Sequence, residues 1–234
     1  MRKTIFPWLG REFILLSGEA RGSGSVEQQT EELFERFETE LRASNLSLEN
    51  TVRTRIFAAD KDARELATHA RSKILSGKRK AASSSYISAS HFDSNARIAL
   101  DLLAMRPSRP EAERQPVDFE PSRLYISWLR YDEIAFVSGF TSELDRLENQ
   151  VSAVFADIDV VLKTSSTSWK HVVRLSVYVS RTQNLHVLKN LLRDANRLEL
   201  SKTEFEFVDG FARDKGLLEV EATAERDGHF GRER

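Results

Sequence analysis

The chain has 234 residues, a net charge of −1 and no cysteine. This near-neutral balance argues against a broad surface for nucleic acid or anionic membranes. The absence of cysteine excludes disulfides, thiolate nucleophiles and sulfur-ligated zinc. Arg11 and Glu12 interrupt the apolar residues near the start, so we expect neither a signal peptide nor a membrane span. We therefore expect a cytoplasmic protein that binds no nucleic acid and no membrane.

An internal repeat organises the sequence. The runs Phe13–Gly18 and Ile134–Gly139 are apolar and end in Ser-Gly, which is typical of a buried strand with a tight exit. Gly18 and Gly139 lie 121 positions apart. The same offset, without a gap, relates six further pairs of identical residues: Glu27 and Glu148, Gln29 and Gln150, Phe34 and Phe155, Ser47 and Ser168, Val52 and Val173, Arg53 and Arg174. This agreement indicates a duplication, and each copy is long enough to bury its own core.

Hydrophobic periodicity predicts the elements of the first copy, which we assign to residues 1–106. Strands are expected over 4–9 and 12–17, followed by a helix from about 27 to 43 and a strand over 51–58. A second helix over about 63–75 is expected to place Leu66, Ala70 and Ile74 inward. Strands over 84–90 and 97–105 then close the copy.

Residues 107–123 hold four of the five prolines of the chain, mixed with charged residues. We predict a stiff, exposed linker there. The second copy, residues 124–224, repeats the order of elements, and residues 225–234 are expected to form a flexible tail. Its predicted strands and helices cover residues 124–129, 133–137, 144–163 (helix), 172–179, 185–197 (helix), 203–208 and 217–224.

Each copy is thus predicted to be an α+β domain of order β-β-α-β-α-β-β, with both helices on one face of its sheet. The second face of each sheet must be solvated or covered by another sheet. Because Tyr86, Phe205 and Phe207 are candidates for that face, we expect it to be buried between domains and subunits.

The motifs, taken in this order, resemble the YjgF/Rid (reactive intermediate deaminase) family. They are the two strands ending in Ser-Gly, the helix openings of Glu-x-Gln type at 27–29 and 148–150, the stretch Leu48–Val52 and the closing stretch Leu218–Ala222. The resemblance covers nearly the whole chain, twice. It implies two domains of chorismate-mutase-like fold in tandem, assembly into a homotrimer, and ligand clefts between neighbouring domains.

The resemblance also implies roles for residues of the second copy. In the family, an arginine holds the substrate carboxylate, a glutamate on the last strand orients water, and a tyrosine lines the pocket. Glu219 stands at the glutamate position and Tyr125 at the tyrosine position, while Lys202 stands at the arginine position. Ser138 and Gly139 end the strand that borders the cleft. We therefore take Glu219 as the catalytic candidate and the other four as substrate-binding candidates.

The residues themselves leave these roles open. Lys202 could pair with a carboxylate, or it could be a solvated lysine at the start of a strand. Glu219 and Glu221 are expected to point the same way, because side chains along a strand alternate, so one of them can be structural. In the first copy the corresponding positions carry Thr4, Ala81 or Ala82, and Ala99, so only the second copy keeps charged site residues.

Two functions follow as hypotheses. The first is a protein that binds a small carboxylate or carbonyl metabolite in an interdomain cleft, with hydrolytic chemistry of the imine or enamine deaminase type. The alternative is a non-catalytic assembly or regulatory protein of the same fold. The alternative is favoured by the first copy, in which the positions that correspond to the site residues carry no charge.

We expect no metal and no cofactor, because the five histidines show no metal-ligand spacing. The basic turn Lys78-Arg79-Lys80 could contact a phosphate, although such a turn is also typical of a solvated helix end.

Overall fold

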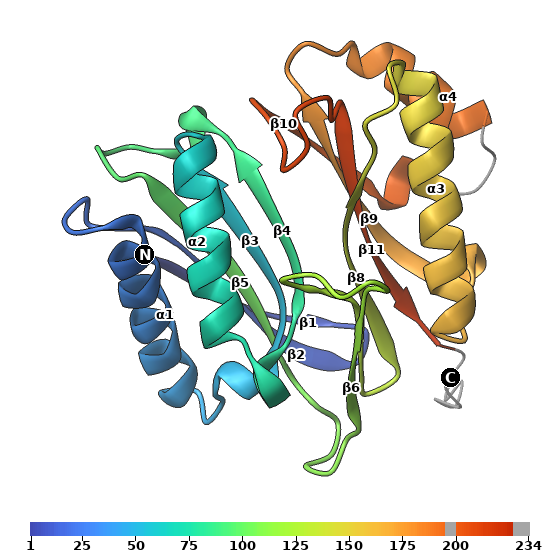
Figure 1. The fold of residues 1–234 in the computed structure, drawn as a ribbon. Coiled ribbons are helices and arrows are strands. Elements are labelled where there is room, and N and C mark those ends of the chain that lie inside the picture. Colours follow the sequence, from blue (N-terminus) through green and yellow to red (C-terminus); the bar gives the residue numbers. More distant parts are fainter. Residues whose placement is uncertain (195–199, 227–234) are drawn as a thin grey trace.

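The computed structural model describes residues 1–194 and 200–226, which form four layers (Figure 1). Helices form the two outer layers, and two sheets face each other between them. Each sheet comes from one half of the chain.

The first half forms a five-stranded sheet of order β1-β2-β5-β3-β4. Strands β3 and β4 run parallel, and the other neighbours run antiparallel. The elements are β1 (Arg2–Trp8), β2 (Arg11–Glu19), α1 (Val26–Arg42), β3 (Thr51–Ala58), α2 (Lys61–Ile74), β4 (Ala82–Ile87) and β5 (Ile98–Arg106).

The second half forms a six-stranded sheet of order β10-β9-β11-β8-β7-β6. Strands β9 and β10 run parallel, as their counterparts β3 and β4 do. The elements are β6 (Arg114–Asp118), β7 (Ile126–Tyr131), β8 (Ile134–Thr141), α3 (Leu147–Thr164), β9 (Val172–Ser180), α4 (Leu185–Asp194), β10 (Thr203–Val208) and β11 (Leu218–Glu225).

The predicted α+β class and the repeated order β-β-α-β-α-β-β, with helices on one face of each sheet, are confirmed. The range 107–123 differs from a fully exposed linker, because it contains β6, which pairs with β7. Pro116 lies in β6, where a residue without an N–H donor is tolerated because β6 is an edge strand. The last three residues of the predicted helix 185–197 and the tail residues 227–234 lie outside the described residues.

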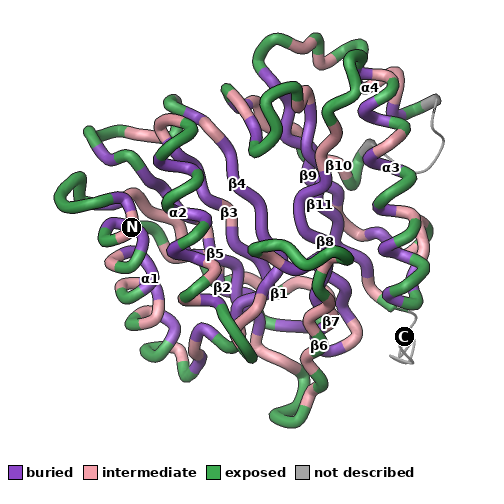
Figure 2. Tube along the Cα trace, viewed as in Figure 1, coloured by how far each residue is buried: buried purple, intermediate pink, exposed green. Residues whose placement is uncertain are grey.

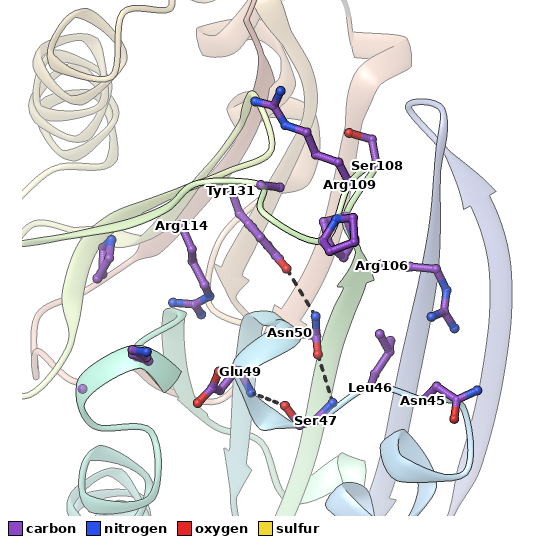
Figure 3. A pocket seen from close by; sticks show the side chains of 16 residues that line it. Asn45, Leu46, Ser47, Glu49, Asn50, Arg106, Ser108, Arg109, Arg114 and Tyr131 are labelled. Atoms are coloured by element: carbon purple, nitrogen blue, oxygen red, sulfur yellow. Dashed lines mark hydrogen bonds between the residues drawn. The ribbon is translucent and has the colours of Figure 1, made fainter.

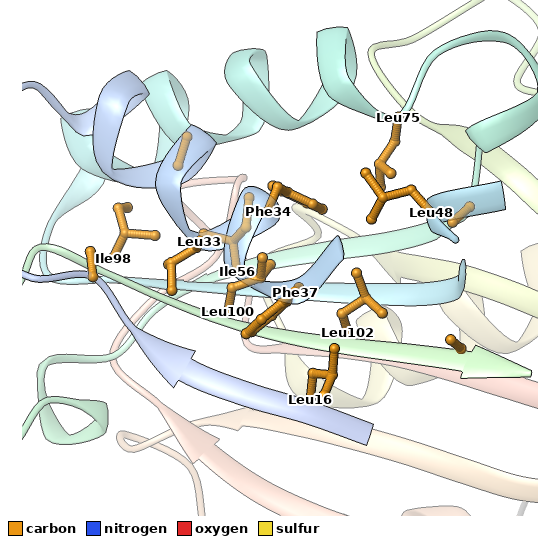
Figure 4. Close-up of a cluster of buried hydrophobic side chains, with 14 of the residues drawn as sticks. Leu16, Leu33, Phe34, Phe37, Leu48, Ile56, Leu75, Ile98, Leu100 and Leu102 are labelled. Carbon is orange, nitrogen blue, oxygen red and sulfur yellow. The ribbon is translucent and has the colours of Figure 1, made fainter. Parts of the chain in front are cut away.

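Helix α1 covers the first sheet through one apolar face. Ser25 caps it by accepting a hydrogen bond from the Gln28 amide, and the Gln28 side chain accepts one from the Ser25 amide in return. Leu33, Phe37 and Leu41 are fully buried against the sheet, as their helical spacing predicts. Figure 4 shows this core, in which Leu33 and Phe37 lie over Leu16, Leu100 and Leu102 of the strands.

Helix α2 corrects one expectation about its buried face. Leu66 is 40% exposed, whereas Ala63, Ala67 and Ala70 are buried. The stripe of alanines packs into the core of the first domain, which turns Leu66 to the opposite side of the helix. Each of these alanines is followed directly by a buried polar residue. Arg64, Thr68 and Arg71 therefore form a second buried face, which carries arginines instead of apolar side chains.

The inner faces of the two sheets bury each other within one chain. In Figure 2 the strands that line this interface are mostly coloured as buried. Phe13 of β2 and Phe136 of β8 meet edge to face, with ring centroids 6.4 Å apart, inside an apolar cluster shared by both halves. Tyr86 is fully buried in the interface, as expected. Phe205 and Phe207 instead pack against the core of the second half. Side chains alternate along β10, and Glu206 and Val208 are the ones that face the first half.

The two halves contribute different strands of their inner faces to this contact. Strand β4 of the first half lies beside β7 and β8 of the second. Arg53 of β3 donates hydrogen bonds to the carbonyls of Val137 on β8 and Ala222 on β11, at 3.1 and 2.7 Å. Arg174, its counterpart in the repeat, instead pairs with Glu204 within the second half. The pairing is therefore head to tail, which brings β3 and β4 of the first half against β8 and β11 of the second.

Candidate functional site

Two buried glutamates on β11 lie at the head-to-tail contact. Glu219 is 4% exposed and Glu221 is 1% exposed. Burying a carboxylate is costly unless it is paired or becomes neutral. The surroundings of the two glutamates show that Glu221 is paired and that Glu219 becomes neutral.

Glu221 is held as an anion by the first domain. Arg55 of β3 donates to Oε2 from Nη2 at 2.6 Å and from Nε at 3.0 Å, and Arg53 Nε lies 3.3 Å from the same oxygen. The hydroxyls of Ser84 and Tyr86 donate to Oε1. Burial alone would raise the pKa of Glu221, but the charges of Arg55 and Arg53 lower it to about 2. Glu221 therefore carries a fixed negative charge that joins the two domains.

Glu219 forms no ion pair with a described residue. Its Oε1 is buried, has no hydrogen-bond partner among the described residues and lies over Gly139, where an added Cβ would come within 2.0 Å of it. Burial, followed by the charge of Glu221, raises the pKa of Glu219 to about 8, although Tyr86, Arg64 and Arg71 act in the opposite direction. At pH 7 the carboxyl group is therefore mostly protonated, and it can give up a proton.

The cations near Glu219 come from helix α2. Arg71 is 2% exposed, and its Nη1 donates to the carbonyl of Ser84 at 2.6 Å. Arg64, two turns earlier, is 6% exposed, donates to Ser85 Oγ at 3.4 Å and pairs with the more exposed Glu65 at 3.3 Å, while its buried Nε has no partner among the described residues. Burial lowers the pKa of Arg71 to about 10, partly offset by Tyr125 and Glu219, so this guanidinium stays charged at pH 7. The region next to Glu219 is thus cationic.

Two hollows open beside these arginines. One has a volume of about 430 Å³ and is lined by Arg64, Thr68 and His69 together with residues 123–125. The other has a volume of about 70 Å³ and is lined by Arg71 and Ser83 with the same three residues. Tyr125 therefore lies at the wall between the two hollows, half-buried and edge-on to Phe119. The larger hollow is in the size range of small-molecule sites.

The structure brings some of the candidate residues together. Gly139 contacts the carboxyl group of Glu219, and Tyr125 lies near Arg71. Ser138 is fully buried; its Oγ accepts a hydrogen bond from the Ser83 amide at 3.0 Å and donates to the carbonyl of Ile126 at 2.6 Å. Its hydroxyl thus ties β8 to β4 across the interface.

Lys202 lies elsewhere. It is exposed and belongs to the short helix Leu200–Lys202 that precedes β10. There it lines a separate hollow of about 230 Å³ together with Trp8 and Arg174. None of the three lines the hollows at Tyr125, so the cation that the resemblance placed on Lys202 is supplied to the cleft by α2 of the first domain.

Arg64 and Arg71 were missed because the predicted inner face of α2 ran through Leu66. The signal in the sequence is the stripe Arg64, Thr68, Arg71, which lies directly beside the alanine stripe at helical spacing. The first domain therefore contributes charged residues to the candidate site through these arginines. The positions in it that correspond to the family's site residues are nevertheless uncharged.

Within residues 1–194 and 200–226, no group of three or more His, Asp or Glu side chains is arranged to hold a metal ion. Over the same residues, no helix has both the length and the apolar character needed to cross a membrane.

Comparison with known proteins relates the chain to others by structure alone. No family model matches the sequence, and no curated protein matches it. A chorismatase crystal structure matches with a TM-score of 0.64 at 15% identity, over 92% of this chain and 74% of that one. A YjgF family member from Mycobacterium tuberculosis matches 48% of this chain and 99% of its own, at 22% identity and a TM-score of 0.42. Another, from Neisseria meningitidis, matches 50% and 97% at 18% identity and a TM-score of 0.41.

The match to chorismatase extends over both sheets and concerns the fold. The motifs predicted a YjgF/Rid-like fold present twice, and the structure contains two mixed sheets, each with its helices in the same order. The chain is therefore an α+β protein that carries the predicted Rid fold twice, and its overall fold resembles that of chorismatase.

Proposed function

We propose that the chain binds a small metabolite with a carboxylate group in the interdomain cleft and hydrolyses an imine or enamine in it. The observation that carries this proposal is Glu219, a carboxyl group that is neutral at pH 7 and lies close to two buried arginines. A pair of carboxyl groups with widely separated pKa values is a common feature of acid–base sites.

Recognition of the carboxylate is assigned to Arg71 and Arg64. A guanidinium can donate two parallel hydrogen bonds to a carboxylate, a geometry that an ammonium group cannot reproduce. Tyr125 would form an aromatic wall of the same cleft. The head-to-tail pairing supports this assignment, because the arginines come from one domain and the proton donor from the other.

The chemical step is assigned to Glu219. Its proton passes to the nitrogen of an imine, or to the carbon of an enamine, and produces an iminium ion. The carboxylate that results accepts a proton from the water that attacks the iminium carbon. Glu219 then gives its proton to the nitrogen of the resulting carbinolamine, and the C–N bond breaks as ammonia leaves. The hydroxyl proton returns to the Glu219 carboxylate as the carbonyl forms, so the net reaction consumes one water. Because the acid form of Glu219 is lost above its pKa of about 8, the rate is expected to fall as the pH rises through that value.

An assay with freshly generated 2-iminopropanoate would test the proposal, with chorismate, which has no C–N bond, as a comparison compound. We expect Glu219→Gln to lower kcat/KM roughly a hundred-fold or more on the active substrate, because it removes the proton donor. Arg71→Gln is expected to raise KM about ten-fold or more, and Arg71→Lys to restore only part of the loss.

Lys202→Ala is the matched control, because Lys202 lines a different hollow. It is expected to leave both constants unchanged. A rate with 2-iminopropanoate no greater than that of buffer, or equal rates in the wild type and Glu219→Gln, would contradict the catalytic role.

A non-catalytic binding protein is the second candidate. It is favoured by the small volume of the hollow beside Arg71, about 70 Å³, which is well below the size of typical small-molecule sites. Ligand-induced thermal shift separates the two functions, since any ligand of the folded state raises its stability. Binding of small carboxylic acids without turnover would favour this candidate.

A further inference from the structure

A larger cavity lies away from the two glutamates. It has a volume of about 850 Å³ and is formed by the segment 45–50, the turn at Gly77 and Lys78, the connection 106–112, β6 and β7. It shares no lining residue with the hollows at Tyr125. The ion pair between Lys80 and Asp118, at 2.7 Å, lines the smaller of those hollows and not this cavity. Both domains contribute to its walls (Figure 3).

The lining of this cavity carries more positive than negative charge. Lys78 and Arg109 are exposed, and neither forms an ion pair with a described residue. Arg106 also lines the cavity, but Glu12 neutralises it at 3.0 Å. Glu49 is the carboxylate among the lining residues. This concentration of cations occurs in a chain whose net charge is −1, so it is a local property of the cavity.

Arg114 adds a third cation, one whose hydrogen bonds are incomplete. Its Nη2 donates to the carbonyl of Thr51 at 2.7 Å, and its guanidinium carbon lies 5.8 Å from the centre of the Tyr131 ring. Nε and Nη1 are buried and have no hydrogen-bond partner among the described residues. Buried donors are rarely left unpaired in folded proteins, and an unpaired one often indicates a bound water or ion. Burial also lowers the pKa of Arg114 to about 10, which leaves it charged at pH 7.

The rest of the cavity is preformed and partly apolar. Asn50 Nδ2 donates to the Tyr131 hydroxyl at 3.2 Å, and Asn50 Oδ1 accepts from the Ser47 amide at 3.0 Å, as the dashed lines in Figure 3 show. Apolar wall is supplied by Leu46, Pro107, Pro110, Ala112 and Pro116. A mixed lining of this kind fits a ligand that has both an organic body and a charge.

From this cavity we propose a second ligand site, distinct from the Glu219 cleft, for an organic oxyanion of metabolite size. The phosphate or carboxylate group of the ligand binds Arg114, Lys78 and Arg109, and its organic body lies against Tyr131 and the prolines. The sequence allowed two roles for the basic turn Lys78-Arg79-Lys80, a phosphate contact or a solvated helix end. Lys78, the first residue of this turn, lies at the rim of the proposed site.

Isothermal titration of the full chain tests the site with four probes: citrate, inorganic pyrophosphate, adenosine monophosphate and adenosine. We expect at least one of the three anions to bind and adenosine not to bind. Binding of citrate alone would identify a carboxylate ligand. Binding of pyrophosphate and adenosine monophosphate would identify a phosphate ligand. The double variant Lys78→Glu/Arg109→Glu is expected to weaken anion binding about ten-fold, because each exposed ion pair contributes modestly. Both side chains are exposed, so the fold should tolerate these changes.

Arg146→Glu is the matched control, since Arg146 is an exposed arginine at the start of α3 and does not line the cavity. It should bind like the wild type. Glu219→Gln should also bind normally, which separates this site from the proposed activity. Failure of all three anions to bind at millimolar concentration would overturn the proposal. So would equal affinity in the wild type and the Lys78→Glu/Arg109→Glu variant.

Discussion

Glu219 and Glu221 occupy alternate positions on one strand and are both buried, yet their pKa values are about 8 and about 2. The difference comes from their partners. Arg55 forms two close hydrogen bonds to Glu221, whereas the arginines near Glu219 act on its charge without a hydrogen bond to it. One carboxyl group is thus a structural anion and the other a proton donor.

Gly139 provides the space for Glu219. A Cβ at position 139 would lie 2.0 Å from Oε1 and 2.6 Å from Cδ of Glu219. We expect Gly139→Ala to lower the free energy of unfolding by about 1–3 kcal/mol, because the buried carboxyl group must move into packed surroundings. In the background of Glu219→Ala most of this cost should disappear, which a double-mutant cycle in urea would measure.

Gly18, the counterpart of Gly139 in the repeat, is the matched control. An added Cβ there would meet no heavy atom closer than 3.4 Å. Gly18→Ala should therefore change stability little. Equal destabilisation by the two alanines would contradict the account of Gly139.

At the scale of elements, β3 and β11 join the domains through buried charge. Glu221→Gln would leave Arg55 and Arg53 without their counter-charge, and we expect it to cost about 3–5 kcal/mol of unfolding free energy. Glu204→Gln on β10 breaks a more exposed pair with Arg174 and should cost less than about 1 kcal/mol. Urea unfolding of both variants measures the difference, and similar losses would argue against a structural role for Glu221.

The sign of the pH dependence follows from the lowered pKa of Glu221. The folded state holds the ionised form more strongly than the unfolded chain does, whose pKa is near 4.5. This contribution to stability is present above pH 4.5 and is lost as the pH falls towards 2. Glu221→Gln should lack that loss, so its urea midpoint should change less over this range.

The sequence predicted most elements but not all of their surfaces. Long periodic stretches such as α1 and α3 were predicted correctly, because each has a single apolar face set by its own sequence. Strand β6 was missed because it has five residues and includes Pro116, so its sequence resembles a linker. The second buried face of α2 was missed because arginine is rarely buried, so arginines at helical spacing indicate an exposed face.

At the scale of the whole molecule, the repeat predicted two domains but not how they pair. Pairing depends on side chains that differ between the copies, such as Arg55, whose counterpart in the repeat is Ser176 and which pairs with Glu221. Positions related by the repeat meet in places: Arg11 Nε and Asp132 Oδ2 lie 2.5 Å apart, and Arg55 donates to Ser176 Oγ at 3.2 Å.

This arrangement bears on assembly. Much of each sheet's inner face is already buried within one chain, so that burial needs no second subunit. The homotrimer and the domain boundaries at 106, 123 and 224 stay predictions. Light scattering measures the first of these.

The central claim is that Glu219 is a neutral carboxyl group at pH 7, buried near the arginines of α2 at the contact between the domains. Carbon-13 NMR of side-chain carboxyl groups across a pH titration tests it most directly, with Glu219→Gln to assign the signal. We predict one glutamate that titrates near pH 8 and is missing in the variant. If the assigned signal instead titrates near pH 4.5, Glu219 is charged at pH 7 and the proposed proton donor is contradicted.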